Sequence, residues 1–212
     1  MQPTFLIENN FDTKIICGID EAGRGPLAGP VVACTFLVNR EKFLPKINDS
    51  KKIPKSKRRK IFHDLIDNHK YGVGIVDNFQ IDKINILQAT KLAMKISFDN
   101  FCEKYGLSAD ILLVDGNMVP FEKIQNLQEI LPIIKGDQKS ISIACASIVA
   151  KEVRDDIMDK YHQQFPDFEF NKHYGYGTKK HIENINKYGI SPIHRKSFEP
   201  IKSILKHKYE NC

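Results

Sequence analysis

Residues 15–38 read IICGIDEAGRGPLAGPVVACTFLV, and this stretch decides the expected fold. Its two apolar runs, residues 15–20 and 31–38, each have the length of a buried strand. The segment between them holds three glycines and two prolines, which favours a structured loop over a helix. We therefore predict two strands joined by a glycine-rich loop, with the acidic pair Asp20 and Glu21 where the first strand ends.

The rest of the chain predicts an α/β domain. Further short apolar runs predict strands at residues 71–76, 111–114 and 130–134. Apolar residues at helical spacing, with proline or threonine at the start, predict helices from Pro54 and over residues 84–105, 142–165, 178–189 and 199–209. This order favours a mixed sheet in one domain, residues 1–212, with residues from about 166 to 212 forming a C-terminal helical extension.

The composition is that of a soluble globular protein. Of 212 residues, 42% are apolar and 27% are charged. The sequence has no apolar run near the roughly 20 residues that a membrane span needs. The first ten residues carry no basic side chain and no long apolar core, which argues against a secretory signal. We expect a cytoplasmic protein.

The cysteines predict free thiols. There are five of them, an odd number, and no two form a C-x-x-C pair. This pattern argues against a disulfide framework and lacks the spacing of a zinc site. The five residues are Cys17, Cys34, Cys102, Cys145 and Cys212.

Positive charge is concentrated in one segment. Lys and Arg number 32 against 26 acidic residues, a net charge of +6, and seven of the ten residues 51–60 are basic. Such a block favours a polyanion through contacts with its phosphates. For a charge run alone, a solvated helix face is the more common explanation, so the block supports nucleic-acid binding only beside a catalytic site.

Acids follow two of the predicted strands. Asp20 and Asp115 are each the first acid after an apolar run, and Gly23 and Gly116 follow them. A carboxylate at the end of a buried strand is costly without a partner, so two in the same context suggest a shared divalent cation. Capping of turns is the alternative. Clustered carboxylates repel one another, so binding of the cation should stabilise the fold.

Two further acids are less clearly placed by pattern alone. Glu21 neighbours Asp20, and neighbours on a regular strand face opposite ways, so both reach one metal only if the strand breaks there. Asp155 continues a polar helical row with Ser147 and Lys151, which spacing alone assigns to a solvent-facing side.

Residues 18–31, GIDEAGRGPLAGPV, closely resemble the type 2 bacterial ribonuclease H family, ribonuclease HII. Six more blocks of the resemblance follow in the same order and span almost the whole chain. They are DSKK at 49–52, VDGN at 114–117, KGD at 135–137, ASIVAK at 146–151 with RD at 154–155, HYGYGT at 173–178 and HRKSF at 194–198.

The resemblance implies a ribonuclease H-like fold, a five-stranded mixed sheet flanked by helices with a C-terminal helical segment. It implies an endonuclease that hydrolyses RNA in RNA–DNA hybrids and cuts 5′ of single ribonucleotides embedded in DNA, leaving 3′-hydroxyl and 5′-phosphate ends. Two divalent ions, Mg²⁺ or Mn²⁺, would serve the reaction. By motif match, the catalytic and metal-binding carboxylates are Asp20, Glu21, Asp115 and Asp155.

The resemblance also implies substrate contacts. Gly23, Arg24 and Gly25 match the loop that recognises the ribonucleotide 2′-hydroxyl, the group that separates RNA from DNA. Tyr176 matches a tyrosine that packs on the sugar of the next nucleotide. Lys51 and Lys52 would contact backbone phosphates. His173 and His194 match family positions to which we assign no chemistry.

Arg24 and Tyr176 place the chain with type 2 rather than the related type 3 enzymes. The end of the chain, residues 210–212, shows no aromatic sliding-clamp motif, so we expect no clamp binding through it. Separately, we expect a monomeric enzyme. Two other functions stay open. A proofreading exonuclease would begin its site with acids one residue apart, and a non-catalytic binder of hybrid or double-stranded RNA would use residues 51–60 without acids.

Overall fold

One five-stranded mixed sheet forms the centre of the molecule. The computed structural model describes residues 2–13, 15–42, 47, 53–122 and 127–210, with side chains to residue 206. The strands are β1 (Ile16–Ala22), β2 (Val31–Leu37), β3 (Lys70–Val76), β4 (Ile111–Asp115) and β5 (Glu129–Ile133). They lie in the order β3-β2-β1-β4-β5. β1, β2 and β3 pair antiparallel, whereas β1, β4 and β5 pair parallel, which confirms the predicted mixed sheet.

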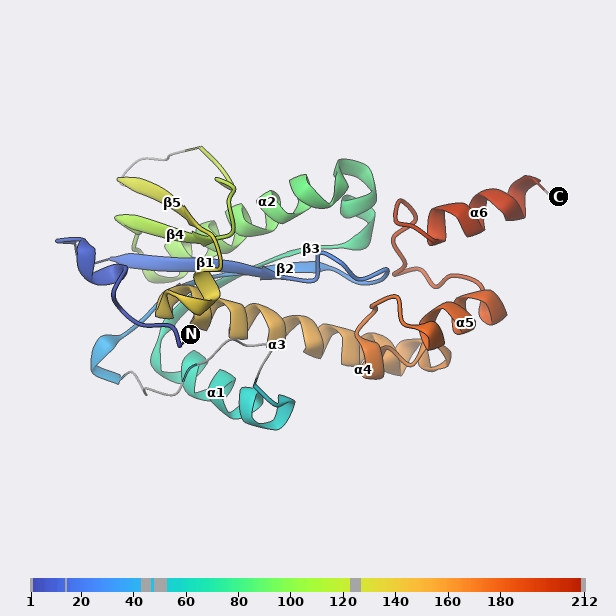
Figure 1. Ribbon diagram of the computed structural model, residues 1–212, viewed down its shortest axis with the longest axis horizontal. Helices are drawn as coiled ribbons and strands as arrows, with labels where there is room; N and C mark the ends of the chain where they lie inside the picture. The colour runs from blue at the N-terminus through green and yellow to red at the C-terminus, as the bar shows by residue number, and fades with distance from the viewer. Residues whose placement is uncertain (1, 14, 43–46, 48–52, 123–126, 211–212) are drawn as a thin grey trace.

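Helices cover both faces of this sheet. The α-helices are α1 (Lys55–Asn68), α2 (Asn78–Tyr105), α3 (Ile141–Gln164), α4 (Phe170–His173), α5 (Lys179–Tyr188) and α6 (Ile201–Glu210). Short 3₁₀ turns are η1 (Glu8–Asn10), η2 (Arg40–Lys42), η3 (Gly136–Gln138) and η4 (Pro166–Phe168). Figure 1 shows α2 on one face, α3 and α1 on the other, and α4 to α6 beyond one end of the sheet.

The alternation of side chains along β1 assigns its residues to two different cores. Cys17 and Ile19 pack with Met94 and Phe98 of α2 in one apolar cluster. Gly18 faces α3, and a Cβ atom there would collide with the backbone of α3 at Ser142 and Ile143. The absence of a side chain therefore lets α3 lie directly on β1, which brings Asp20 to the same helix.

The helix predicted at residues 84–105 begins earlier in the structure, at Asn78. Asp77 caps this start, because its side chain accepts a hydrogen bond from the backbone N of Gln80 at 2.8 Å. Asn85 then interrupts the helix with φ 66° and ψ 164°. Its side chain accepts hydrogen bonds from the next amides, Leu87 N and Gln88 N, at 3.0 and 3.1 Å. Asn85 thus acts as a second N-cap, and the apolar pattern had detected only the segment that follows it.

The C-terminal helices are attached to the loop between β1 and β2. Leu27 and Ala28 from that loop share an apolar cluster with Met158 of α3 and with Phe168 and Phe170. Backbone bonds join the same regions, since Leu27 N donates to Gly175 O at 2.7 Å and Arg195 N donates to Leu27 O at 2.8 Å. The glycine-rich loop is therefore held by contacts with α3 and with two C-terminal segments, around Gly175 and around Arg195.

Two predictions from composition concern the described residues directly. Cys17, Cys34, Cys102 and Cys145 are free thiols, as predicted, and Cys212 lies outside the described residues. None of the helices that could be searched in the described ranges has the length and apolar character needed to cross a membrane.

Candidate active site

The structure brings Asp20 and Asp115 to neighbouring strand ends. β1 and β4 pair in parallel with Ile19 opposite Val114, so the next residue on each strand is the acid. Both acids lie at the same edge because parallel strands end on the same side of a sheet. The two acids therefore lie side by side, and the divalent cation that the sequence predicts between them stays a prediction.

Asp20 is more deeply buried than Asp115, with only 5% of its surface exposed. The Ser147 hydroxyl donates to its carboxylate, and the Glu21 amide donates to Asp20 Oδ1 at 2.7 Å. Burial, followed by the nearby charges of Glu21 and Asp115, raises the pKa of Asp20 well above its usual value despite these two donors. Additional positive charge beside Asp20 would favour its ionised form.

Glu21 lies in the same electrostatic field. Burial raises the pKa of Glu21, the positive charge of Arg24 opposes this, and Asp115 adds to the rise. Arg24 Nη1 lies 3.3 Å from Glu21 Oε1. The strand ends at Ala22, and Gly23 follows with φ 98°, a conformation that side chains rarely adopt. The break predicted at the two acids is therefore not observed: β1 stays paired with β2 through Asp20, Glu21 and Ala22, and the chain leaves the strand only at Gly23.

Asp115 lies against a further acid that the sequence pattern left without a role. Asp115 Oδ1 accepts hydrogen bonds from the backbone N of Gly136 at 2.7 Å and of Asp137 at 3.3 Å. These amides open the turn η3, and Asp137 is only 6% exposed. A signal was available in the sequence, since Asp137 also follows a short apolar run, the strand β5.

Asp155 faces a different part of the molecule. Its Oδ2 atom accepts from Arg58 Nη2 at 3.0 Å, and its Oδ1 atom accepts from Lys151 Nζ at 2.5 Å. Ser147, which contacts Asp20, precedes Asp155 by eight residues on α3, roughly 12 Å along the helix axis. The structure thus brings Asp20, Glu21 and Asp115 together and pairs the carboxylate of Asp155 with cations from α1 and α3.

Part of the basic block is structural. Arg58 is buried and its Nε lies 2.5 Å from Glu152 Oε1, while Arg59 Nη1 lies 2.7 Å from Asp156 Oδ1. These two arginines hold α1 against α3. A count of basic residues in the sequence cannot distinguish such structural arginines from arginines that bind phosphate. Lys57 and Lys60 remain exposed on α1. The predicted phosphate contacts Lys51 and Lys52 lie outside the described residues.

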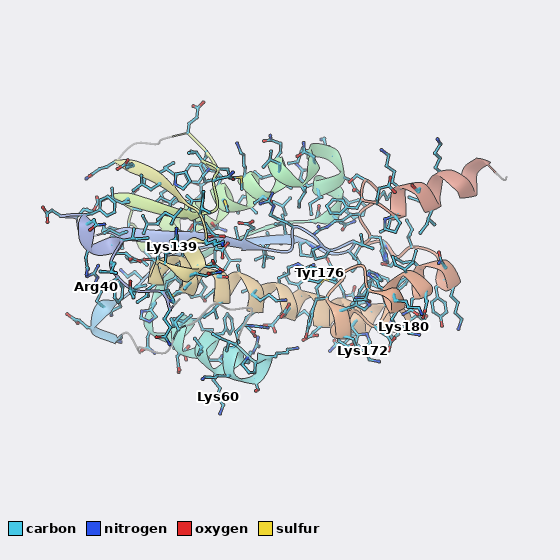
Figure 2. The ribbon with its side chains drawn as sticks, in the orientation of Figure 1. Arg40, Lys60, Lys139, Lys172, Tyr176 and Lys180 are labelled. Atoms are coloured by element: carbon cyan, nitrogen blue, oxygen red, sulfur yellow. The ribbon has the colours of Figure 1, made fainter. Side chains whose placement is uncertain are left out.

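The predicted substrate loop and Tyr176 are neighbours. A Cβ atom built on Gly25 would lie 3.8 Å from the Tyr176 ring. Tyr176 is 46% exposed and stands between the sheet and the C-terminal helices in Figure 2. Exposed lysines project from the flanking helices, Lys60 from α1 and Lys172 and Lys180 from α4 and α5 (Figure 2). An aromatic face beside an open glycine loop suits contact with a sugar.

Three histidines support Tyr176 from inside. Burial lowers the pKa of His181 to about 4, and burial together with His181 lowers the pKa of His194 to about 3. Their Nε2 atoms lie 3.0 Å apart, and His181 Nδ1 lies 2.9 Å from the Tyr176 carbonyl oxygen. His173 stacks on His181, with ring centroids 4.3 Å apart. Burial also lowers the pKa of His173, and the three rings pack together inside the C-terminal region.

The donors at the carboxylate edge suit a hard cation. Within the described residues, no group of three or more His, Cys, Asp or Glu side chains is arranged as a complete metal ligand set as it stands. Mutual repulsion of carboxylates opposes such an arrangement, and the raised pKa values of Asp20 and Glu21 reflect that repulsion together with burial. Carboxylate oxygens are what Mg²⁺ and Mn²⁺ prefer, so the residues present fit a divalent ion.

Comparisons with known proteins agree with this geometry. The family model described as Ribonuclease HII matches residues 17–201. Ribonuclease HII of Macrococcus caseolyticus is 45% identical over 94% of this chain and 72% of its own length. Ribonuclease HII of Caldanaerobacter subterraneus is 50% identical over 91% of this chain and 76% of its own length.

Solved structures show the same fold. The ribonuclease H2 of Pyrococcus horikoshii superimposes with a TM-score of 0.74 at 23% identity, covering 93% of this chain and all of the other. Bst-RNase HIII, solved in complex with Mn²⁺, gives a TM-score of 0.72 at 16% identity, over 99% of this chain and 75% of the other. At these identities the likeness establishes the ribonuclease H-like fold. Because the family model and both relatives match most of its length, the chain belongs to the ribonuclease HII family of metal-dependent endoribonucleases.

Proposed function

We propose that this chain is an endonuclease that hydrolyses the RNA strand of RNA–DNA hybrids. We further propose that it cuts 5′ of single ribonucleotides embedded in DNA, leaving 3′-hydroxyl and 5′-phosphate ends. One observation carries the proposal: Asp20 near the end of β1 lies beside Asp115 at the end of the parallel strand β4, and Glu21 lies close enough to interact with both. Membership of the ribonuclease HII family supports the class of substrate.

Asp20, Glu21 and Asp115 are the proposed ligands of two divalent ions, Mg²⁺ or Mn²⁺. When bound, such ions supply an activated water and stabilisation of the leaving oxygen. The protein groups hold the ligands in place: the Ser147 hydroxyl orients Asp20, and the Gly136 amide orients Asp115. Burial, and after it the charges of Glu21 and Asp115, raises the pKa of Asp20, and a bound cation would favour its ionised form.

Asp137, rather than Asp155, is our proposed fourth ligand. The backbone of Asp137 already contacts the Asp115 carboxylate, which places it at the same strand edge. Asp155 has one cation on each carboxylate oxygen, Lys151 and Arg58, and a divalent ion would have to displace both. We assign Asp155 the role of holding α1 against α3, and the two assignments are separable by mutation.

Recognition of the ribonucleotide is assigned to the loop of Gly23, Arg24 and Gly25, with Tyr176 beside it. Glycines let the backbone approach a sugar closely, and Arg24 can pair with a phosphate. Lys51 and Lys52 are retained as proposed phosphate contacts on the basis of the sequence motif alone. Cytoplasmic activity, a monomeric state and absence of clamp binding through residues 210–212 remain predictions.

The deciding experiment uses a DNA duplex with one internal ribonucleotide, incubated with Mg²⁺ or Mn²⁺, with products sized on a denaturing gel. We expect one cut 5′ of the ribonucleotide. The Asp20→Asn variant should lose about a thousandfold or more in rate, since metal stabilisation of transition-state charge is worth several kcal/mol. It should still bind the duplex. Asp99→Asn, an exposed change in α2, is the matched control and should cleave as the parent protein does.

Other outcomes identify the alternatives. Trimming from duplex ends indicates an exonuclease, and binding of a hybrid without products indicates a non-catalytic binder. Full cleavage by Asp20→Asn contradicts the assignment of the carboxylate site, whatever the substrate.

A further inference from the structure

Two fully buried arginines lie beneath the proposed substrate loop. Arg154 comes from α3, and Arg195 comes from the segment before α6. Arg195 donates through Nη2 to Gly23 O at 2.6 Å and Pro30 O at 3.1 Å, through Nη1 to Arg24 O at 3.0 Å, and through Nε to Gly29 O at 2.9 Å. Arg154 donates to Pro30 O at 3.0 Å, Tyr174 O at 3.1 Å and Ala28 O at 3.1 Å.

These arginines are unusual because all seven of those bonds go to backbone carbonyls. Among the described residues, no acidic side chain makes an ion pair with either guanidinium. Burial lowers the pKa of both, and the charge of Arg154 lowers that of Arg195 further. Burying two like charges together is costly, so only a well-matched set of acceptors makes the arrangement stable.

The acceptors determine how the loop is oriented. A trans peptide is planar, and its N–H points opposite to its C=O. Since Arg195 draws the carbonyls of Gly23 and Arg24 inward, the amides of Arg24 and Gly25 must point away from it. Those two N–H groups are then directed to the side of the loop opposite to the buried arginine.

Gly23 is fitted to the same arrangement. A Cβ atom at Gly23 would collide with the Arg154 side chain, and φ 98° disfavours any side chain there. Arg154 therefore occupies the space under Gly23 while Arg195 binds its carbonyl. The conformation of the loop depends on the two guanidiniums as much as on its own glycines.

We propose that Arg154 and Arg195 are positioning residues for ribonucleotide recognition. They orient the peptides of residues 23–25 so that cleavage depends on a 2′-hydroxyl, although they touch neither substrate nor metal ligands. This inference rests on the proposed function. It goes beyond it by naming side chains outside the site that set its selectivity.

The test compares two duplexes that differ in one group, a 2′-hydroxyl or a 2′-fluoro substituent on a single nucleotide, both with Mn²⁺. Arg195→Lys keeps the positive charge but loses the planar fork of donors. We expect its kcat/KM on the 2′-hydroxyl duplex to fall by about tenfold to a hundredfold, the effect of about 1–3 kcal/mol of lost polar contacts. Its rate on the 2′-fluoro duplex should change little, so the ratio of the two falls.

A merely structural role would not change that ratio, because partial unfolding lowers both rates equally. Arg58→Lys is the matched control: Arg58 is also buried, but it binds the side chains of Glu152 and Asp155. It should lower the unfolding midpoint and keep the ratio. Arg195→Ala supplemented with millimolar guanidinium chloride should recover selectivity, whereas sodium chloride at equal ionic strength should not restore it.

Arg154→Lys keeps the Arg195 bonds to Gly23 and Arg24 and serves if Arg195→Lys does not fold. It removes the support under Gly23, so its ratio should also fall. A folded variant of either arginine with the parent ratio overturns the proposal. Failure of the parent protein to cut at the ribonucleotide would instead overturn the proposed function, which keeps the two failures distinct.

Discussion

The acids at the sheet edge and the acids in the middle of α3 differ in what faces them. Asp20 and Asp115 accept hydrogen bonds from a hydroxyl and from backbone amides, which carry no charge. Glu152 and Asp155 are as buried as Asp20, but Arg58 contacts both of them, Arg59 also contacts Glu152, and Lys151 also contacts Asp155. The first group gathers negative charge that needs a cation, and the second group already contains its cations.

This difference is the basis on which we propose which carboxylates bind a metal and which do not. Burial alone does not separate the two groups, and neither does sequence spacing, because Asp155 follows a helical row as regularly as any ligand would. The partners of each oxygen separate them. The following predictions test the comparison, from the largest expected effect to the smallest.

Replacing Arg58 with methionine should be the most damaging change to stability. Glu152 and Asp155 would then each lose a buried guanidinium partner, and breaking a buried pair costs about 3–5 kcal/mol. Urea unfolding followed by circular dichroism measures this cost. A change in unfolding free energy below about 1 kcal/mol would show that the α1–α3 contact is not a stabilising ion-pair network.

Asp137→Asn and Asp155→Asn should have different consequences. We expect Asp137→Asn to lose about a hundredfold in kcat, equivalent to about 2.7 kcal/mol, with little change in unfolding free energy. Asp155→Asn should lose stability and keep most of its activity per folded molecule. Active-site titration and thermal unfolding measure the two effects. Loss of activity without loss of stability in Asp155→Asn, with the opposite result in Asp137→Asn, would indicate that Asp155 is the metal ligand.

Divalent cations should stabilise the fold through the sheet edge. Mn²⁺ at about 100 times its dissociation constant should add about 2.7 kcal/mol to the unfolding free energy, because it binds only the folded state. Asp20→Asn should lose this gain, whereas Asp155→Asn should keep it. Equal stabilisation of both variants would place the cation elsewhere.

Acid should weaken the C-terminal region through its histidines. The folded pKa of His181 is lowered to about 4 and that of His194 to about 3, against about 6.5 when unfolded. Between about pH 6.5 and 4 the unfolded state binds more protons than the folded state. The stabilising contribution of the neutral histidines is therefore full above about pH 6.5 and decreases as the pH is lowered through this range. Each histidine contributes up to about 1.4 kcal/mol per pH unit.

The measurement is urea unfolding at pH 7, 6 and 5. His181→Asn should show a shallower dependence on pH than the parent chain, since one titrating group is removed. His63→Asn changes an exposed residue of α1 and provides the control, with the slope of the parent. An unchanged slope in His181→Asn would show that this cluster is not the source of the acid sensitivity.

Local patterns account for what could be predicted. An apolar run ending in an acid identifies Asp20 and Asp115 without knowledge of the fold, because strand, turn and carboxylate are adjacent in sequence. The five strands and their order with the helices follow from the same kind of local signal. The apolar pattern did not predict the start of α2 at Asn78, because Asn85 interrupts the helix and the pattern is continuous only after that residue.

Contacts between distant segments account for what could not be predicted. Arg58 and Asp155 are separated by 97 residues, so nothing near Asp155 indicates that its partner comes from α1. Two of the seven basic residues in 51–60 lose their apparent role in phosphate binding for the same reason, since Arg58 and Arg59 pair with acids of α3. Asp137 has its own local signal, but only its position beside Asp115 gives that signal meaning.

The bond from Arg195 to Gly23 spans 172 positions of the chain, and it has a consequence for biosynthesis. A ribosome makes Gly23 early and Arg195 late, so the nascent polypeptide can assemble its sheet long before the loop after β1 receives its support. Such distant closure is slow compared with local folding. On the proposed role of Arg195, the loop gains its selectivity for a ribonucleotide only after the segment that carries Arg195 has left the ribosome and folded.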